Sequence, residues 1–290
     1  TDDKQNRVRV WGNNYKYLWH MAEDPSASQV KDSTSTGADA TSEGTMTPSD
    51  LVAAVAGSGI DFDGSNDKLN FPNSFAGAGA LTIGMWVNQR TASNDDAAIF
   101  FGTTSQGKAR MLFTSVNNLV RLSFNGNTVN TTTDLQNAGW KHVVWTYDDA
   151  KQSRLYVDGA LAHGPASHPG TNSTVGTTGS IGAHANSGDW LNAQLDQVGV
   201  ATVARSLAWI QTEYENQRVT GNAFFKSIGG EDPLGASFQN LDAIQAIGDV
   251  YDKLLVTSGA NTTGLVGNFP VVTMQCGSSD TAGAEMLPLG

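Results

Sequence analysis

The chain has 290 residues, a formal net charge of -11 and one cysteine, Cys276. This length accommodates one large all-β domain, or one domain with a smaller appendage. The 17 Lys and Arg residues do not cluster, so we expect no nucleic-acid partner. A single cysteine excludes an internal disulfide. No apolar run is long enough to span a bilayer, so we expect no membrane insertion.

The composition favours a neutral polar surface with many turns, because only 16% of the residues are charged and 32 are glycine. Such a profile is common in secreted and surface proteins, so we expect an extracellular, cell-surface or virion location. The chain begins at Thr1 and shows no signal peptide. This start fits a mature product whose leader or upstream domain was removed, and it equally fits a trimmed chain.

Residues 1–14 include an alternating stretch, Arg-Val-Arg-Val-Trp, followed by Gly12 and Asn13. This pattern predicts one strand and a turn. The strand is either an edge strand of the domain that follows or the remnant of an upstream domain.

Residues 15–217 show short apolar or alternating runs separated by Gly, Asn, Asp and Ser clusters, a spacing typical of a β-sandwich. Within 25–57 we expect a long surface loop with one short helical or strand piece at 51–55. A short helix should follow Ser206, with Leu207, Ile210 and Tyr214 on one face. The predicted strands are 17–21, 59–62, 68–71, 81–88, 97–102, 109–115, 120–124, 142–147, 153–157, 180–183 and 194–200.

The most informative stretch is 140–159. It contains Trp-Lys-His-Val-Val-Trp-Thr-Tyr, a polar segment, and Leu-Tyr-Val-Asp-Gly. These runs predict an antiparallel hairpin closed by a second tight turn at Asp158 and Gly159. The stretch resembles the hairpin of laminin-G-like domains in the concanavalin A-like lectin and glucanase superfamily. Residues 59–74, 81–87 and 195–200 resemble further parts of that family in the expected order.

The resemblance implies an all-β, two-sheet antiparallel jelly-roll sandwich over residues 15–217. Members of the superfamily are sugar-cleaving enzymes or non-catalytic binding and adhesion modules.

Residues 218–290 depart from the family pattern. Apolar residues between 241 and 255 fall at helical spacing, and 269–276 has the composition of a strand. We expect a small C-terminal helix-plus-strand appendage. Because it cannot bury its own apolar faces well, it should act as a docking or assembly segment, on the sandwich or on another subunit.

A catalytic centre is not expected. Glycosidases of the superfamily place two carboxylates at alternating positions on one strand, and no Glu-x-Asp-x-Glu run occurs. A Gly-x-Ser-x-Gly elbow is also missing. His142 lies in the hairpin and should serve packing, whereas His163 and His168 should lie in a solvated loop.

Calcium is the expected ion. The resemblance implies a structural calcium that joins the first sandwich strand to the last, with Asp196 as one ligand and Glu23 or Asp24 as its partner. The alternative is that Asp196 accepts backbone hydrogen bonds and Asp24 starts a turn before Pro25.

For ligand binding we consider aromatic and polar residues in loops. Trp86 and Trp145 lie in apolar strands and should belong to the core. Trp190 is either a ligand platform or a cap on the core, and the loop 91–97, with Asn94, Asp95 and Asp96, is a candidate binding rim.

These observations favour a non-catalytic module that binds glycan or protein ligands through its loops. The alternative is a structural subunit of a virion, fibre or surface assembly, with self-assembly through the termini. An unusual glycoside hydrolase is the third hypothesis.

Overall fold

The computed structural model describes residues 11–75, 79–92, 95–102, 109–115, 119–124, 127–169, 176–184 and 189–218, and the backbone of four short strands beyond residue 254. The chain divides into two compact units, 1–220 and 221–290.

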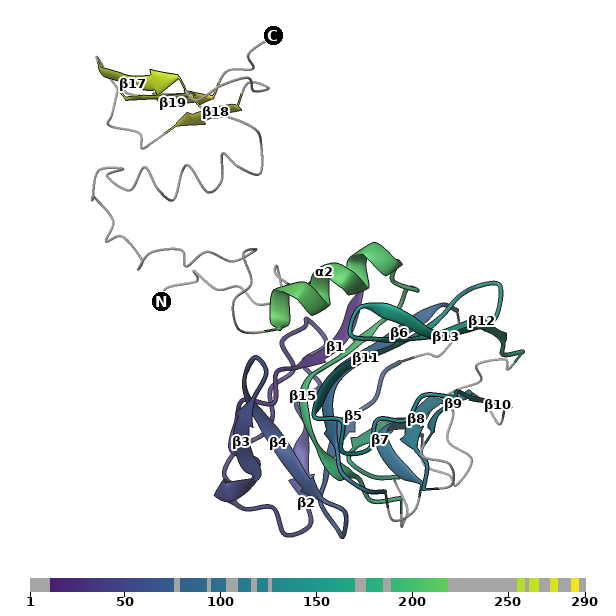
Figure 1. The fold of residues 1–290 in the computed structure, drawn as a ribbon. Helices are drawn as coiled ribbons and strands as arrows, with labels where there is room; N and C mark the ends of the chain where they lie inside the picture. The colour runs from purple at the N-terminus through teal and green to yellow at the C-terminus, as the bar shows by residue number, and fades with distance from the viewer. Residues whose placement is uncertain are drawn as a thin grey trace. The chain divides into compact units, whose positions relative to one another are not determined.

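The first unit contains two antiparallel sheets, which confirms the predicted all-β sandwich (Figure 1). The larger sheet has eight strands in the order β13-β12-β11-β6-β15-β4-β3, with β1 also paired to β15. Its strands are β1 (Tyr15–Trp19), β3 (Leu51–Ala54), β4 (Gly57–Asp63), β6 (Leu81–Gln89), β11 (Trp140–Tyr147), β12 (Gln152–Val157), β13 (Ala160–Ser167) and β15 (Asn192–Ala201).

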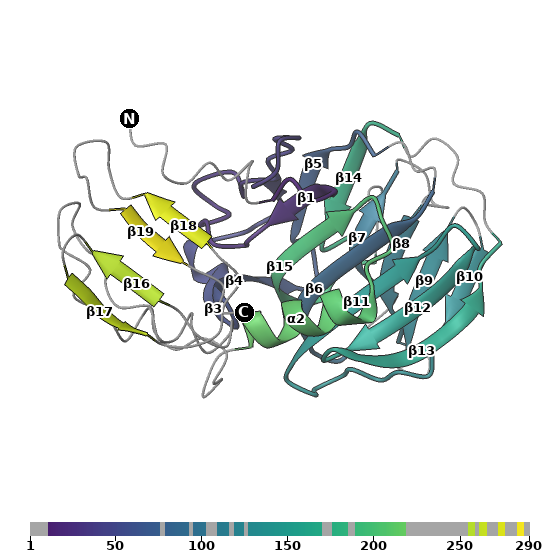
Figure 2. The same ribbon diagram turned by 90° about the horizontal axis from the view of Figure 1, so that it is seen from above.

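The smaller sheet has seven strands in the order β10-β9-β8-β7-β14-β5-β2. Its strands are β2 (Thr41–Glu43), β5 (Lys68–Pro72), β7 (Asp96–Phe101), β8 (Ala109–Phe113), β9 (Val120–Phe124), β10 (Asn127–Asn130) and β14 (Thr178–Ile181). Figure 2 shows the two layers from above. A short 3-10 helix, η1 (Pro48–Asp50), precedes β3.

The core lies between the two sheets, where alternate side chains of each strand meet. The rings of Tyr17 and Trp19 stack with centroids 5.2 Å apart, and Trp145 is fully buried. Trp86 is also buried, at 3% exposed, as predicted, although it lies outside the inter-sheet cluster.

The helix α2 (Leu207–Gln217) lies across the outer face of the larger sheet, away from the smaller one (Figure 1). Ser206 caps its start, since its side chain accepts a hydrogen bond from the Trp209 amide. Ile210 is buried against Val144 and Tyr156. Leu207 was expected on this buried face, but it is 43% exposed. No helix in the described part of the chain could cross a membrane.

The predicted hairpin is present as β11 and β12, with Trp145 opposite Leu155. The segment after its second turn was predicted as a loop, but it forms β13, an edge strand that contains Pro165. Proline is compatible with an edge strand because one side of the strand needs no ladder donor. His163 therefore lies in a strand. His168 is fully buried, and its ring nitrogens contact Ser153 Oγ at 2.8 Å and the Asn127 carbonyl at 3.0 Å. The solvated-loop prediction was wrong for both histidines.

The second unit contains two antiparallel strand pairs within its described residues. They are β16 (Leu255–Ser258) with β17 (Asn261–Leu265), and β18 (Val272–Gln275) with β19 (Gly283–Met286). The predicted strand at 269–276 corresponds to β18. Most of the helix predicted between 241 and 255 lies outside the described residues.

Candidate functional site

Polar side chains gather on the face of the smaller sheet that points away from the core. Phe100, Arg110 and Ser123 are direct cross-strand neighbours on β7, β8 and β9. The residues on either side of Arg110, Ala109 and Met111, belong to the core. Because side chains alternate along a strand, Arg110 and its cross-strand neighbours point to the opposite face.

Three charged residues, Asp95, Arg121 and Asp189, surround Arg110. Arg121 on β9 forms an ion pair with Asp95, which precedes β7, and both side chains are partly exposed, at 26% and 32%. Burial lowers the pKa of Arg110, while the charges of Asp189 and Asp95 oppose that shift. Burial also raises the pKa of Asp189, and His184 and Arg110 counteract the increase. We call Asp95, Arg110, Arg121 and Asp189 the charged cluster.

Two buried polar atoms of this face lack a hydrogen-bond partner among the described residues. They are Nε of Arg110 and Oγ of Ser123, and the two residues are opposite each other on β8 and β9. Buried polar groups are normally paired. Two such groups on directly paired residues therefore indicate a place where bound water or another polar group completes the hydrogen bonding.

Trp190 extends this face toward β5. Its ring lies 5.8 Å from Nζ of Lys68. Lys68 alternates with the core residue Leu69 and therefore lies on the outward face of β5. Trp190 is only partly buried and directly follows Asp189, so an aromatic ring adjoins the charged cluster.

The two loops predicted as ligand-binding loops lie side by side. The Ala97 amide donates to the Asp189 carbonyl at 3.0 Å, and the Asn192 amide donates to Oδ2 of Asp96 at 3.1 Å. Asp96 was expected on a loop rim, but it is a fully buried residue of β7 whose carboxylate holds these loops together. Asn94 lies outside the described residues.

Sequence reasoning placed Asp95 and Trp190 in candidate loops but missed Arg110, Arg121 and Asp189. The signal available was the pair of runs Ala-Arg-Met-Leu-Phe and Val-Arg-Leu-Ser-Phe, in which an arginine stands between apolar residues. Such a pattern places arginine on an outward face. It does not reveal which strands are neighbours.

The residues predicted to bind calcium occupy different environments. Asp196 is fully buried on β15; its Oδ2 accepts the Ala56 amide at 2.7 Å, and its Oδ1 has no donor among the described residues. Burial raises the pKa of Asp196, and hydrogen bonds from the Ala56 amide and from Gln197 counteract that shift. Oε2 of Glu23 is also buried and without a donor in the described structure. Asp24 accepts hydrogen bonds from the amide and hydroxyl of Ser26, at 2.9 and 2.7 Å.

Unsatisfied carboxylate oxygens suit a hard cation such as calcium. However, the described residues contain no group of three or more His, Cys, Asp or Glu side chains arranged to hold a metal. Glu23, Asp24 and Asp196 thus do not form such a group. A calcium ion at Glu23 or Asp196 would need backbone carbonyls or water as further ligands, and the site stays a prediction.

The sandwich with a helix on one sheet and a polar, aromatic-flanked site on the other defines a lectin-like β-sandwich domain. A family model described as the concanavalin A-like lectin/glucanases superfamily matches residues 63–211, just over half of the 290 residues. The chain belongs to this superfamily, as the resemblance of its hairpin implied. No curated protein sequence matches the chain.

Solved structures share the fold at low sequence identity. The binding domain of Paraclostridial Mosquitocidal Protein 1 has a TM-score of 0.55 at 14% identity, covering 70% of this chain and 52% of that one. A structure of botulinum neurotoxin type C, described as depending on two ganglioside molecules to enter cells, has a TM-score of 0.56 at 13% identity, with 73% and 53% covered. The chain thus spans about half the length of these toxin chains.

A third similar structure is nearly the same size as the matched region. It is domain 4 of AbnA, a GH43 extracellular arabinanase from Geobacillus stearothermophilus, in complex with arabinotriose. Its TM-score is 0.56 at 11% identity, and the match covers 69% of this chain and 97% of that domain. At 11–14% sequence identity, the similarity of these structures to the chain shows a shared fold.

Proposed function

We propose that residues 15–217 form a carbohydrate-binding module that holds a glycan on the outward face of the smaller sheet. The observation that supports this most is the pair of neighbouring unsatisfied atoms, Arg110 Nε and Ser123 Oγ. A sugar hydroxyl can both donate and accept, so hydroxyls of a glycan are suitable partners for the Nε donor and for the Ser123 hydroxyl.

The surroundings of these atoms suit the same ligand. Asp95 and Asp189 supply acceptors, Arg121 supplies donors, and Trp190 supplies an aromatic surface. A few fixed polar groups beside an aromatic ring are the usual composition of a small-molecule site. Ganglioside and arabinotriose in the descriptions of two similar structures support a glycan as the ligand. A role outside the cell, on a cell surface or on a virion, is part of this proposal.

We propose binding without cleavage. Asp95 is ion-paired with Arg121, and Asp189 lies close enough to Arg110 for their charges to interact. A guanidinium does not give up its proton at ordinary pH, so the two carboxylates are balanced by permanent cations rather than arranged for proton transfer. Incubation with any glycan that binds should therefore release no new reducing ends, and their release would contradict the absence of cleavage.

A glycan array tests the binding directly. The full chain should bind a defined set of glycans. Arg110→Gln should lower the affinity about tenfold or more, because it removes the Nε donor proposed to bind the glycan. Lys31→Gln is the matched control, since Lys31 pairs with Asp39 and lies outside the charged cluster. A blank array at high protein concentration, or equal binding by Arg110→Gln, would contradict the proposal.

A further inference from the structure

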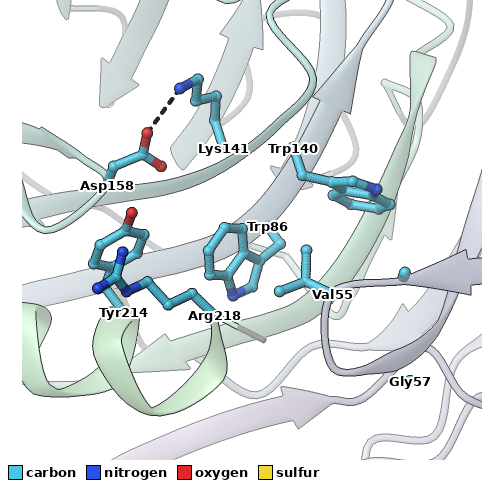
Figure 3. Close-up of a pocket in the computed structure, with 9 residues that line it drawn as sticks. Val55, Gly57, Trp86, Trp140, Lys141, Asp158, Tyr214 and Arg218 are labelled. Carbon is cyan, nitrogen blue, oxygen red and sulfur yellow. Dashed lines mark hydrogen bonds and ion pairs between the residues drawn. The ribbon is translucent and has the colours of Figure 1, made fainter. Parts of the chain in front are cut away.

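A cleft of about 640 Å³ lies on the larger sheet, beside the C-terminal end of α2. Figure 3 shows its lining: Trp86 and Trp140 from β6 and β11, Tyr214 and Arg218 from the helix end, and Lys141 and Asp158 from the hairpin. The tip of the β3-β4 hairpin closes one side. None of these residues belongs to the charged cluster, which lies on the other sheet.

The aromatic part of the cleft is held in place by packing. Trp86 and Tyr214 stack at 30° with ring centroids 5.6 Å apart. Nε1 of Trp86 donates to Oε1 of Gln217 at 2.6 Å, which fixes the indole. Trp140 is only partly buried and turns toward the cleft (Figure 3). A flat, positioned ring of this kind can pack against the C–H face of a pyranose.

The polar part offers a donor beside an acceptor. Nζ of Lys141 lies 2.8 Å from Oδ2 of Asp158, and the two side chains are 31% and 28% exposed. Oδ1 of Asp158 accepts the His142 amide at 3.0 Å, so the carboxylate is oriented by the backbone. An ammonium and a carboxylate next to each other match two adjacent hydroxyls of a sugar, one accepting and one donating.

The two cations at the cleft are each paired with a carboxylate. Lys141 pairs with Asp158, and Nε of Arg218 donates to Oε2 of Glu215 at 2.8 Å. The Arg218 guanidinium lies 5.4 Å from the Tyr214 ring centroid, which orients it at the cleft. Nε binds Glu215, and the other N–H groups of the guanidinium, next to aromatic rings, suit a ligand that has both a carboxylate and an apolar ring face.

We propose that this cleft is a second binding site, and that it takes an acidic saccharide of the hexuronate class. One sugar ring packs on Trp140, hydroxyls of a neighbouring unit of the saccharide bind Lys141 and Asp158, and a carboxylate binds Arg218. The proposal goes beyond the glycan site on the smaller sheet and does not depend on it.

Calorimetry with two acidic probes and their neutral counterparts tests the proposal. The probes are a galacturonate tetrasaccharide and a glucuronate-containing tetrasaccharide, each compared with its methyl ester, which keeps the rings and removes the charge. The full chain should bind at least one acid saturably, with a Kd below about 1 mM. Its ester should bind about tenfold more weakly, because the ester lacks the charge-assisted bond to Arg218.

Variants assign the binding to the cleft. Arg218→Gln should bring the acid and ester affinities together, Trp140→Ala should weaken both about tenfold, and Trp140→Phe should keep most of the affinity because it retains a ring. Lys151→Gln, an exposed lysine outside the cleft, should change nothing. Circular dichroism of each variant confirms that it is folded.

Several results would overturn the proposal. They are the absence of saturable binding by both acids, equal affinity for acid and ester, and full affinity in folded Trp140→Ala. Loss of binding in Arg110→Gln would place the ligand on the smaller sheet and would also overturn it. Conversely, hexuronate binding that persists in Arg110→Gln supports the cleft even if the first site binds no glycan.

Discussion

His142 is a buried titratable residue at the centre of the hairpin. It is 2% exposed and packs against the rings of both Trp86 and Tyr214, whose centroids are 5.1 and 5.9 Å away. Burial lowers its pKa from 6.5 to about 4, and the charge of Asp158 only partly counteracts the shift. The side chain is therefore neutral near pH 7. This supports the packing role that the hairpin pattern predicted.

The pKa of His142 makes stability depend on pH. Between about pH 6.5 and pH 4 the unfolded state binds a proton that the folded state does not, so stability is complete above this window and is lost as the pH falls. Urea denaturation at about pH 7 and pH 4.5 should show a loss of roughly 2 kcal/mol from this residue. His142→Phe should reduce the loss, while His163→Gln should leave it unchanged. Because burial also lowers the pKa of His168, part of the loss of stability at low pH should remain in His142→Phe. A loss as large as that of the wild type would show that His142 is not its source.

Asp32 organises the segment after β1. Its carboxylate accepts three backbone amides, from Leu18 at 3.0 Å, Thr34 at 2.9 Å and Ala38 at 2.9 Å, and it is 2% exposed. Asp32→Ala should leave these buried amides unpaired and lower the free energy of unfolding by about 3 kcal/mol. Asp134→Ala, at an exposed turn, should cost less than about 0.5 kcal/mol. Equal effects in a urea titration would show that Asp32 is not structural.

At the scale of elements, one apolar contact between α2 and the larger sheet is Ile210, which packs on Val144 and Tyr156. The stack of Tyr214 on Trp86 is another. Ile210→Ala should lower the free energy of unfolding by about 2–4 kcal/mol. It should also weaken the binding of any ligand in the cleft beside α2, because Tyr214 and Arg218 lie at the end of the same helix. Thr212→Ala, on the exposed side, is the control. Thermal denaturation checks the stability, and no change in melting temperature would contradict the packing.

The predicted calcium would connect β15 to the segment after β1 through Asp196 and Glu23. If it binds there, a chelator should lower the melting temperature by roughly 4 °C, because an ion that binds only the folded state stabilises it. Asp196→Asn should remove this response, and excess magnesium should not restore it. An unchanged melting temperature of the wild type with EDTA would exclude a stabilising calcium ion.

The strands were predictable where apolar periodicity is strong. Residues 120–124 were predicted and observed as β9 with the same ends. β13 was missed because Gly164 and Pro165 interrupt its pattern, and as an edge strand it has little buried surface to impose alternation. β2 was missed for a similar reason: it has only three residues, none of them buried.

At the scale of the whole molecule, the candidate site depends on strand order. Arg110 on β8 and Arg121 on β9 meet Asp95 and Asp189 only because β7, β8 and β9 are neighbours and residue 189 lies against Ala97. Local patterns predict the face of a strand but not its neighbours. The sequence therefore led to the correct fold and to two residues near the site, Asp95 and Trp190, while the arginines required the sheet.

The cleft beside α2 also could not be predicted from local sequence patterns. Trp86 has the pattern of a core residue, and it is buried, but by a helix that begins 121 positions later at Leu207. Trp140 and Arg218 come together from the first strand of the hairpin and the end of that helix. Neither contact has a signature in the linear sequence.

Glycan binding on the outward face of the smaller sheet can be measured by titrating a glycan selected on the array into isotope-labelled full-length protein and following the amide chemical shifts. We expect saturable shifts concentrated in β7, β8, β9 and at residues 189 and 190, and their loss in Arg110→Gln. Saturable shifts confined to other parts of the protein, or none with any glycan, would contradict binding on this face.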